Sequence, residues 1–145
     1  MKYDELYSCE MRTIEAIIER AADGTYDVYC SKEIFSGAGK TIEDAKEDMK
    51  KQMAFYKKTA LEEGFKYPEF LDQEYEIQYT VDSLSLMKYY VLSGLFSLAG
   101  LEKMTGINQK QLWSYLHGTK PRKTQRNRIT AGFEKLRNEL NAFLA

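Results

Sequence analysis

Apolar and polar residues alternate along two segments near the start of the chain, which is the pattern of half-buried β-strands. Within residues 13–20, isoleucine and alanine take every second position, and residues 26–30 repeat the alternation with tyrosine, valine and cysteine. The pair Asp23-Gly24 between them is typical of a tight turn, because glycine adopts a positive φ without strain. The pattern therefore predicts a β-hairpin.

The period changes to that of a helix after Thr41. Thr41 can cap the first turn, and Glu43 and Asp44 suit the positive end of a helix dipole. The apolar positions then step by three or four residues until Gly64 and Pro68 end the helix. These positions are Ile42, Ala45, Met49, Met53, Tyr56 and Ala60.

Two further segments complete the front part. The small residues 36–39, Ser-Gly-Ala-Gly, are interpreted as a tight connection into the helix, with a short edge strand as an option before them. Residues 74–82 alternate again and predict another strand. A helix on one face of a three- or four-stranded sheet would bury both apolar faces, so we expect a small α+β domain here.

The last third of the chain predicts helices only. Ser97 can cap a short helix that Gly106 ends in the left-handed conformation. Asn108 can cap a second short helix over residues 109–117, and a long helix over residues 124–144 follows. Two short helices joined by a three-residue turn predict an all-α helix-turn-helix domain. The residues expected to pack between the helices are Leu101, Ile107, Leu112, Tyr115 and Leu116.

The net charge of −1 hides an uneven distribution. Residues 97–145 contain nine Lys and Arg against three Asp and Glu, a balance of +6. Residues 1–96 contain 12 against 19, a balance of −7. An overall pI of 5.9 argues against nucleic acid, but a basic segment beside an acidic one favours it for the basic part.

The outward face of the second short helix carries side chains that suit DNA. Gln109 can bond adenine at N6 and N7, and Lys110 can bond guanine at O6 and N7. The helix N-terminus at Asn108 favours phosphate, and a run of basic residues follows the helix. The residues predicted to contact double-stranded DNA are Asn108, Gln109, Lys110, Trp113, Ser114, His117, Lys120, Arg122, Lys123, Arg126 and Arg128.

Parts of that set allow more than one interpretation. Trp113 can pack between the helices or lie against a sugar or base. His117, at a helix end, suits a dipole or phosphate contact better than catalysis. An ordinary helical hairpin with a solvated basic face is the alternative for the whole region.

The order of elements, together with two motifs, resembles a known family. The linker Phe35-Ser36-Gly37-Ala38-Gly39 and the helix start Thr41-Ile42-Glu43-Asp44-Ala45 resemble the HicB antitoxin family, whose signature is a Gly followed by Thr-x-Glu-Glu-Ala. Here Asp44 replaces the second Glu. Residues 101–112 are similar to the Xre/Cro-type helix-turn-helix that many HicB proteins carry C-terminally, although Glu102 stands where a small residue is usual.

The resemblance implies both a fold and a function. The fold is a β-β-β-α-β, degenerate RNase H-like domain (1–82), a connecting helix or linker (83–96) and a helix-turn-helix domain (97–145). The function is that of an antitoxin, which neutralises a small ribonuclease toxin (HicA) through its front domain and represses its operon through the rear one. A HicB-like regulator without a toxin, and a protein-binding scaffold, are the alternatives.

A homodimer or higher homo-oligomer is also expected. One short recognition helix contacts few base pairs, so modules of this type usually act in pairs on two half-sites. The apolar final helix and the edge of the sheet are the candidate contact surfaces.

Enzyme, metal and cofactor hypotheses have little support. Two cysteines, Cys9 and Cys30, and one histidine cannot supply the four usual ligands of a zinc site. The Gly-Lys-Thr at residues 39–41 lacks the earlier glycine of a phosphate loop, because position 34 is Ile. Acids that could serve an RNase H-like metal site lie on alternating strand faces, which are usually solvated. These acids are Glu15, Glu19, Glu74, Glu76 and Asp82. We expect no catalytic residue, no metal and no cofactor.

Targeting signals are not expected either. The longest apolar-rich stretch, residues 83–100, is broken by Lys88 and is too short to span a bilayer. Residues 1–5 are not followed by the apolar core of a signal peptide. These observations predict a cytoplasmic protein with reduced cysteines.

Overall fold

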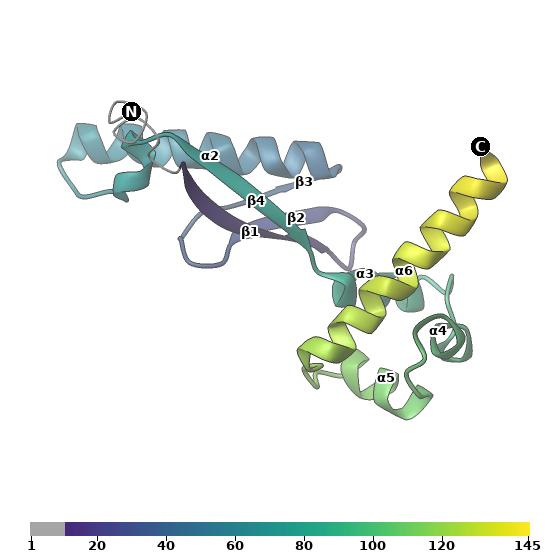
Figure 1. Cartoon of the computed structure of the whole chain (residues 1–145). Coiled ribbons are helices and arrows are strands. Elements are labelled where there is room, and N and C mark those ends of the chain that lie inside the picture. The colour runs from purple at the N-terminus through teal and green to yellow at the C-terminus, as the bar shows by residue number, and fades with distance from the viewer. Residues whose placement is uncertain (1–10) are drawn as a thin grey trace, which may run out of the picture. The chain divides into compact units, whose positions relative to one another are not determined.

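The computed structural model describes residues 11–145 as a mixed α+β chain with a four-stranded sheet (Figure 1). The chain divides into two compact units. Among the described residues, the first unit consists of residues 11–18 and Thr25–Val81. The second unit consists of Glu19–Gly24 and Asp82–Ala145. Cys9 lies outside the described residues.

The sheet of the first unit has the strand order β3-β2-β1-β4. Its strands are β1 (Arg12–Arg20), β2 (Tyr26–Cys30), β3 (Ser36–Gly39) and β4 (Tyr75–Val81). The predicted strands 13–20, 26–30 and 74–82 are therefore confirmed to within a residue. Strands β2 and β3 pair antiparallel, whereas β1 and β4 run parallel with Ile14 opposite Ile77.

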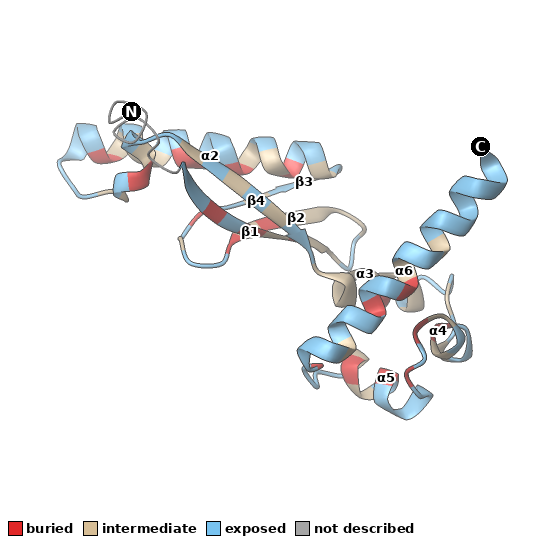
Figure 2. Cartoon of the chain, viewed as in Figure 1, coloured by how far each residue is buried: buried red, intermediate tan, exposed pale blue. Residues whose placement is uncertain are grey.

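Helix α2 (Ile42–Glu63) covers one face of this sheet and packs on β2 and β3 (Figures 1 and 2). The Thr41 hydroxyl accepts a hydrogen bond from the backbone N–H of Asp44 (3.0 Å), and Gly64 ends the helix at φ 77°. The predicted apolar stripe faces the core, where four of its six members are buried and Ile42 and Tyr56 are half-buried. The strands contribute Ile14, Ala16, Ile18, Val28 and Cys30 to the same core.

Residues 36–39 correct one prediction. They form the edge strand β3 themselves and are not a connection that follows one. Neither Gly37 nor Gly39 has a positive φ. A Cβ at Gly37 would lie against the backbone nitrogen of Met49 and 2.5 Å from the carbonyl oxygen of Ala45. The glycines are therefore needed because the α2 backbone passes directly over β3.

A short 3-10 helix, η1 (Glu69–Asp72), closes the far end of the core with the fully buried Phe70. Asp72 accepts hydrogen bonds from Tyr67 (2.9 Å) and pairs with Lys57 Nζ (2.8 Å). These hydrogen bonds, first that of Lys57 and then that of Tyr67, hold the pKa of Asp72 below its ordinary value.

The second unit is helical. Its helices are α3 (Ser83–Leu92), α4 (Leu98–Thr105), α5 (Gln109–Leu116) and α6 (Lys123–Leu144). Its buried core consists of Met87, Leu101, Ile107, Leu112, Tyr115 and Ile129. Gly132 of α6 lets α4 pass closely, because a Cβ there would lie 2.9 Å from the carbonyl oxygen of Met104.

Residues 83–96, expected as a connecting helix or linker, contain helix α3, which belongs to the helical unit. Asp82 caps α3 by accepting a hydrogen bond from the N–H of Leu84 (3.1 Å), and Met87 is buried in the helical core. The end of β1 also belongs to this unit, because the Arg20 N–H donates to the Ser85 hydroxyl (3.0 Å). The continuous part of the helical unit therefore begins at Asp82. The unit also includes Glu19–Gly24, from the hairpin between β1 and β2.

The close approach of α2 to β3 makes Gly37 intolerant of any side chain. We expect Gly37→Ala to lower the free energy of unfolding by about 1–3 kcal/mol, because overpacking here meets backbone that cannot rotate away. Urea unfolding of the full chain, followed by far-UV circular dichroism, measures the change. Ser36→Ala, at an exposed position of the same strand, is the control and should leave the transition in place. Equal midpoints for the two variants would contradict this account.

Candidate nucleic-acid interface

Helices α4 and α5 are joined by the turn Gly106-Ile107-Asn108, with caps at each junction as predicted. The Ser97 hydroxyl accepts from the N–H of Gly100 (3.0 Å) at the start of α4. Gly106 ends α4 in the left-handed conformation at φ 74°. The Asn108 side chain accepts from the N–H of Gln111 (2.9 Å) at the start of α5. Ile107 is buried, so the turn is anchored in the core.

Helix α5 has one buried side and one exposed side. Leu112 and Tyr115 are buried and Leu116 is half-buried, as the helical period predicts. The opposite side exposes Gln109, Lys110, Trp113 and His117, and Ser114 is half-buried. With Leu98 of α4, four of these residues line an open hollow of about 380 Å³. Four of the five side chains predicted to face outward are therefore exposed, whereas Ser114 is half-buried and the exposed Gln111 was not in the predicted set.

Trp113 lies on the surface and not between the helices. Its side chain is 53% exposed and stacks on the His117 ring, with ring centroids 3.8 Å apart and planes inclined by 21°. The His117 Nδ1 atom lies 2.7 Å from the carbonyl oxygen of Trp113, which fixes the imidazole over the indole. The packing interpretation of Trp113 is therefore wrong, and a flat aromatic surface faces outward.

Glu102 has a structural role that was not predicted from the sequence. Its Oε2 atom accepts a hydrogen bond from the backbone N–H of Gln109 (3.0 Å), seven residues along the chain. The carboxylate thus satisfies an N–H group at the start of α5 that Asn108 does not reach. The signal for this role in the sequence was a glutamate at a position where the helix-turn-helix that the segment resembles usually has a small residue. A phosphate was expected to bind at Asn108 and Gln109, at the start of α5. The negative charge of Glu102 disfavours an anion at this position.

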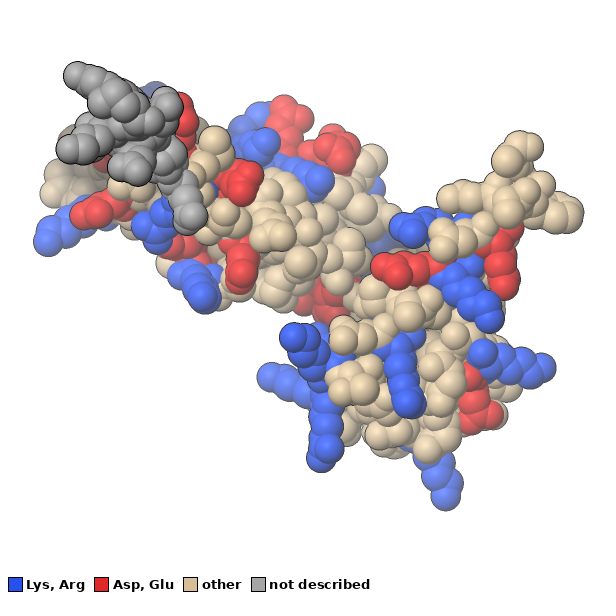
Figure 3. All heavy atoms as spheres, viewed as in Figure 1, with Lys and Arg blue, Asp and Glu red and all other residues tan. Residues whose placement is uncertain are grey.

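The basic run after α5 surrounds the start of α6. Lys120, Arg122, Lys123 and Arg128 are exposed, and the buried Pro121 anchors the segment between them. No side chain caps the N-terminus of α6, which has no acidic residue in its first turn. Figure 3 shows Lys and Arg side chains gathered over this end of the helical unit. Uncapped N–H groups beside several cations form a surface that favours phosphate.

Arg126 differs from the other predicted phosphate contacts. Its Nε atom donates to the carbonyl oxygen of Pro121 (3.3 Å), and its Nη1 atom lies 3.9 Å from Asp82 Oδ1. Since Asp82 caps α3, the guanidinium links the starts of α3 and α6 within the helical unit. Arg126 therefore has a structural role that its position in a basic run did not indicate.

Two of the five acids considered for metal chemistry have other roles in the structure. Asp82 caps α3, and Glu76 accepts a hydrogen bond from the Thr13 hydroxyl (3.1 Å). Among residues 11–145, no three His, Cys, Asp or Glu side chains are grouped as metal ligands. Cys30 is buried beside Met49, and burial, with a smaller contribution from Glu33, raises the pKa of its thiol. No helix in the described part of the chain has both the length and the apolar character needed to cross a membrane.

No protein-family model matches the chain, and neither the search of curated proteins nor that of solved structures found a match. The resemblance to HicB proteins therefore stays a prediction. The functional argument rests on the geometry of the helical unit.

The Glu102 carboxylate should contribute to the stability of the helical unit. We expect Glu102→Ala to lower its free energy of unfolding by about 0.5–2 kcal/mol, the usual cost of losing a helix N-cap. Glu102→Gln retains an acceptor oxygen and should recover much of the loss. Trp113 is the one tryptophan of the chain, so its fluorescence during urea unfolding reports on this unit.

The matched control is Glu134→Ala, which removes an exposed glutamate from α6. It should change the unfolding midpoint little. If Glu102→Ala and Glu134→Ala unfold alike, the contact from Glu102 to α5 does not stabilise the unit.

Proposed function

We propose that this chain is a transcription regulator that binds double-stranded DNA through α5 and the basic segment after it. One observation carries the proposal: α5 is packed through Leu112 and Tyr115 and turns a polar and aromatic face to solvent beside a cluster of cations. A helix presented in this way can enter the major groove. A regulator of this kind would act in the cytoplasm.

The exposed residues divide into two kinds of contact. Gln109, Lys110 and Ser114 lie at the start and middle of α5 and would contact base edges. Lys120, Arg122, Lys123 and Arg128 are flexible cations around the open N-terminus of α6 and suit phosphates. The Trp113–His117 stack lies on the same side of α5 as the base-reading residues and would contact sugar or base. We no longer include Arg126 among the phosphate contacts, because its guanidinium interacts with Pro121 and Asp82 within the helical unit.

A second candidate function, that of a HicB-type antitoxin, is favoured by the sheet face that α2 does not cover. Glu15 and Glu76 are exposed there on the paired strands β1 and β4. Residues 1–18 and 25–81, which make up this unit, contain 10 Lys and Arg against 16 Asp and Glu, and the balance of −6 makes the unit electrostatically complementary to a basic partner, such as a HicA-like ribonuclease toxin. A HicB-like regulator without a toxin is the alternative, and DNA binding is common to both.

Two substitutions separate base reading from charge attraction. On a duplex selected from a random pool by this chain, Gln109→Ala should cost about 1–3 kcal/mol of binding free energy, because a bidentate contact to a base is lost. On random duplexes it should cost far less. Lys120→Ala should weaken binding to both duplexes alike and reduce the slope of log K against log salt by about 0.9. Trp113 fluorescence during titration at several salt concentrations measures both effects.

Lys58→Ala provides the control for charge. It removes an exposed lysine from α2 of the first unit and should leave the salt slope unchanged. Equal losses for Gln109→Ala on both duplexes would mean that α5 does not read sequence. A wild-type chain that binds no duplex at low salt would overturn the proposed function.

The acidic sheet face can be tested with a charge-reversed chain. We expect Glu15→Lys/Glu76→Lys to weaken binding to a small basic protein encoded beside this gene by at least about tenfold, because complementary charge becomes repulsive. Binding to DNA should be retained. The double variant Glu62→Lys/Glu63→Lys makes the same charge change at the exposed end of α2 and serves as the control. Equal effects of the two double variants would show that no particular face binds the partner.

A further inference from the structure

The second half of α6 carries a row of apolar side chains that its own unit does not cover. Ile129 is buried and Phe133 is half-buried in the helical core, and the same stripe continues outward with Leu136, Leu140 and Phe143. Leu140 is 49% exposed, and Phe143 is 87% exposed. Figure 1 shows the end of α6 projecting beyond the other helices of its unit.

The spacing of this stripe is that of a helix-pairing seam. Its steps are four, three, four and three residues, which is the a and d pattern of a heptad repeat. The first half of the seam packs on the core of its own unit. The second half has the correct spacing for another helix but is exposed, together with Leu144 (74% exposed).

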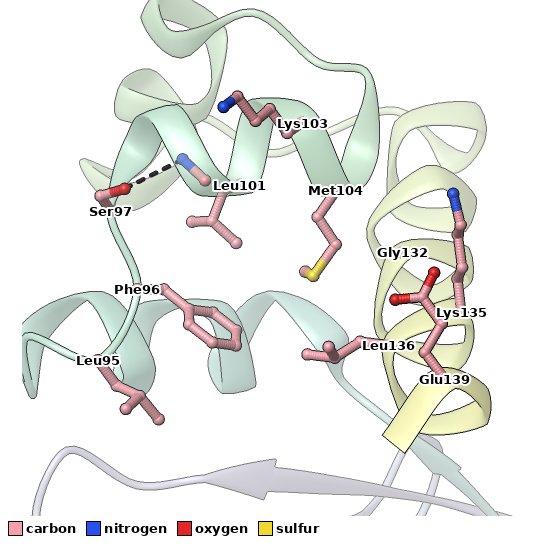
Figure 4. A pocket seen from close by; sticks show the side chains of 11 residues that line it. Leu95, Phe96, Ser97, Leu101, Lys103, Met104, Gly132, Lys135, Leu136 and Glu139 are labelled. Carbon is pink, nitrogen blue, oxygen red and sulfur yellow. Dashed lines mark hydrogen bonds between the residues drawn. The ribbon is translucent and has the colours of Figure 1, made fainter. Parts of the chain in front are cut away.

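An apolar groove lies beside the exposed half of the seam (Figure 4). It has a volume of about 410 Å³ between α4, α6 and the segment before α4. Phe96, Leu101, Met104 and Leu136 form its apolar lining, and Leu95 lies at its side with 66% of its surface exposed. The helical unit therefore has an apolar groove on its surface. One or two helical turns farther along α6, it also exposes apolar side chains, Leu140 and Phe143, of a kind that could fill such a groove.

We propose that two copies of this chain pair through the C-terminal halves of α6, with Phe143 of each copy seated in the groove of the other. The pairing is antiparallel about a two-fold axis, so each copy contributes the same knob and the same hollow. If Phe143 faces Leu136 of the second copy, the two-fold relation places Leu140 beside the axis, next to its own counterpart. The proposal does not depend on DNA binding.

Two other occupants of the groove fit the observations less well. Phe143 cannot enter the groove of its own copy, because α6 is a continuous helix to Leu144 and the groove is lined by Leu136 and Glu139 of the same helix. A small apolar ligand would fill the hollow but would leave Leu140, Phe143 and Leu144 in water. A second copy covers the hollow and the row of side chains together, which is why we choose it.

The mass of the full chain in DNA-free solution tests the pairing. By light scattering at micromolar concentrations, the wild-type chain should have twice the 16.9 kDa of one copy. Phe143→Glu should raise the dissociation constant of the dimer at least about tenfold, since a central aromatic anchor is replaced by a charge. Its far-UV circular dichroism should be unchanged, because residue 143 is exposed within its own unit. Phe55→Glu, at a phenylalanine that is 67% exposed on the first unit, is the matched control and should remain dimeric.

A covalent test locates the axis. Leu140→Cys should form a disulfide-linked dimer in oxidised glutathione, because the two thiols meet at the two-fold axis. The wild-type chain and Phe55→Cys should not. A wild-type monomer, a Phe143→Glu chain that stays dimeric, or equal cross-linking of the two cysteine variants would overturn the inference.

The two proposals can fail separately. A dimer without affinity for duplex DNA would remove the proposed function and leave this inference standing. A monomer that still binds duplex DNA with the expected salt slope would do the reverse.

Discussion

Helix α5 has eight residues, too few to be stable in water alone, so its position depends on contacts outside itself. Its inner side is held by the burial of Leu112 and Tyr115, and its first turn is held by the Asn108 side chain and the Glu102 carboxylate. Buried Ile107 fixes the turn that precedes it. These contacts decide which side chains remain for a ligand, because every residue of α5 that supports the fold lies on the opposite side.

The two helix N-termini near this surface differ in a way that matters for an anion. The start of α5 is occupied by groups of the protein itself, including one negative charge. The start of α6 has no side-chain cap and is surrounded by cations. An incoming phosphate therefore meets a favourable field at α6 and an unfavourable one at the first turn of α5. This arrangement leaves the polar and aromatic side chains of α5 for groups that are less charged.

Local patterns predicted most of the elements, because their signals lie within a few residues. The alternation in β1, β2 and β4, the stripe of α2 and the caps at Thr41, Ser97, Gly106 and Asn108 all matched the structure. The optional edge strand was expected before residues 36–39, but β3 is formed by these residues themselves. Its position was wrong because serine, glycine and alanine have little strand preference, and the need for glycine appears only when α2 lies over the strand. Helix α3 is apolar along most of its length, so its sequence does not tell which side is buried.

The candidate site was predicted less completely, for a related reason. Which residues of α5 are exposed follows largely from the helical period. The contacts of Glu102 with Gln109 and of Arg126 with Asp82, however, join residues that are seven and 44 positions apart in the sequence. Such contacts depend on where two helices cross, which no local pattern specifies. A basic run likewise indicates the sign of the field without showing that one of its members has an internal partner.

The chain crosses between its two units three times, after Ile18, after Gly24 and after Val81. The helical unit is consequently discontinuous in sequence, and Arg20 from the hairpin donates its backbone N–H to Ser85 and lies over the ring of Tyr89 at 4.1 Å. A segment that starts at Asp82 would carry all four helices but not these contacts. Recombination could therefore not transfer the complete helical unit to another protein as a single continuous cassette, since part of its packing is encoded by the codons of residues 19–24, far from those of the four helices.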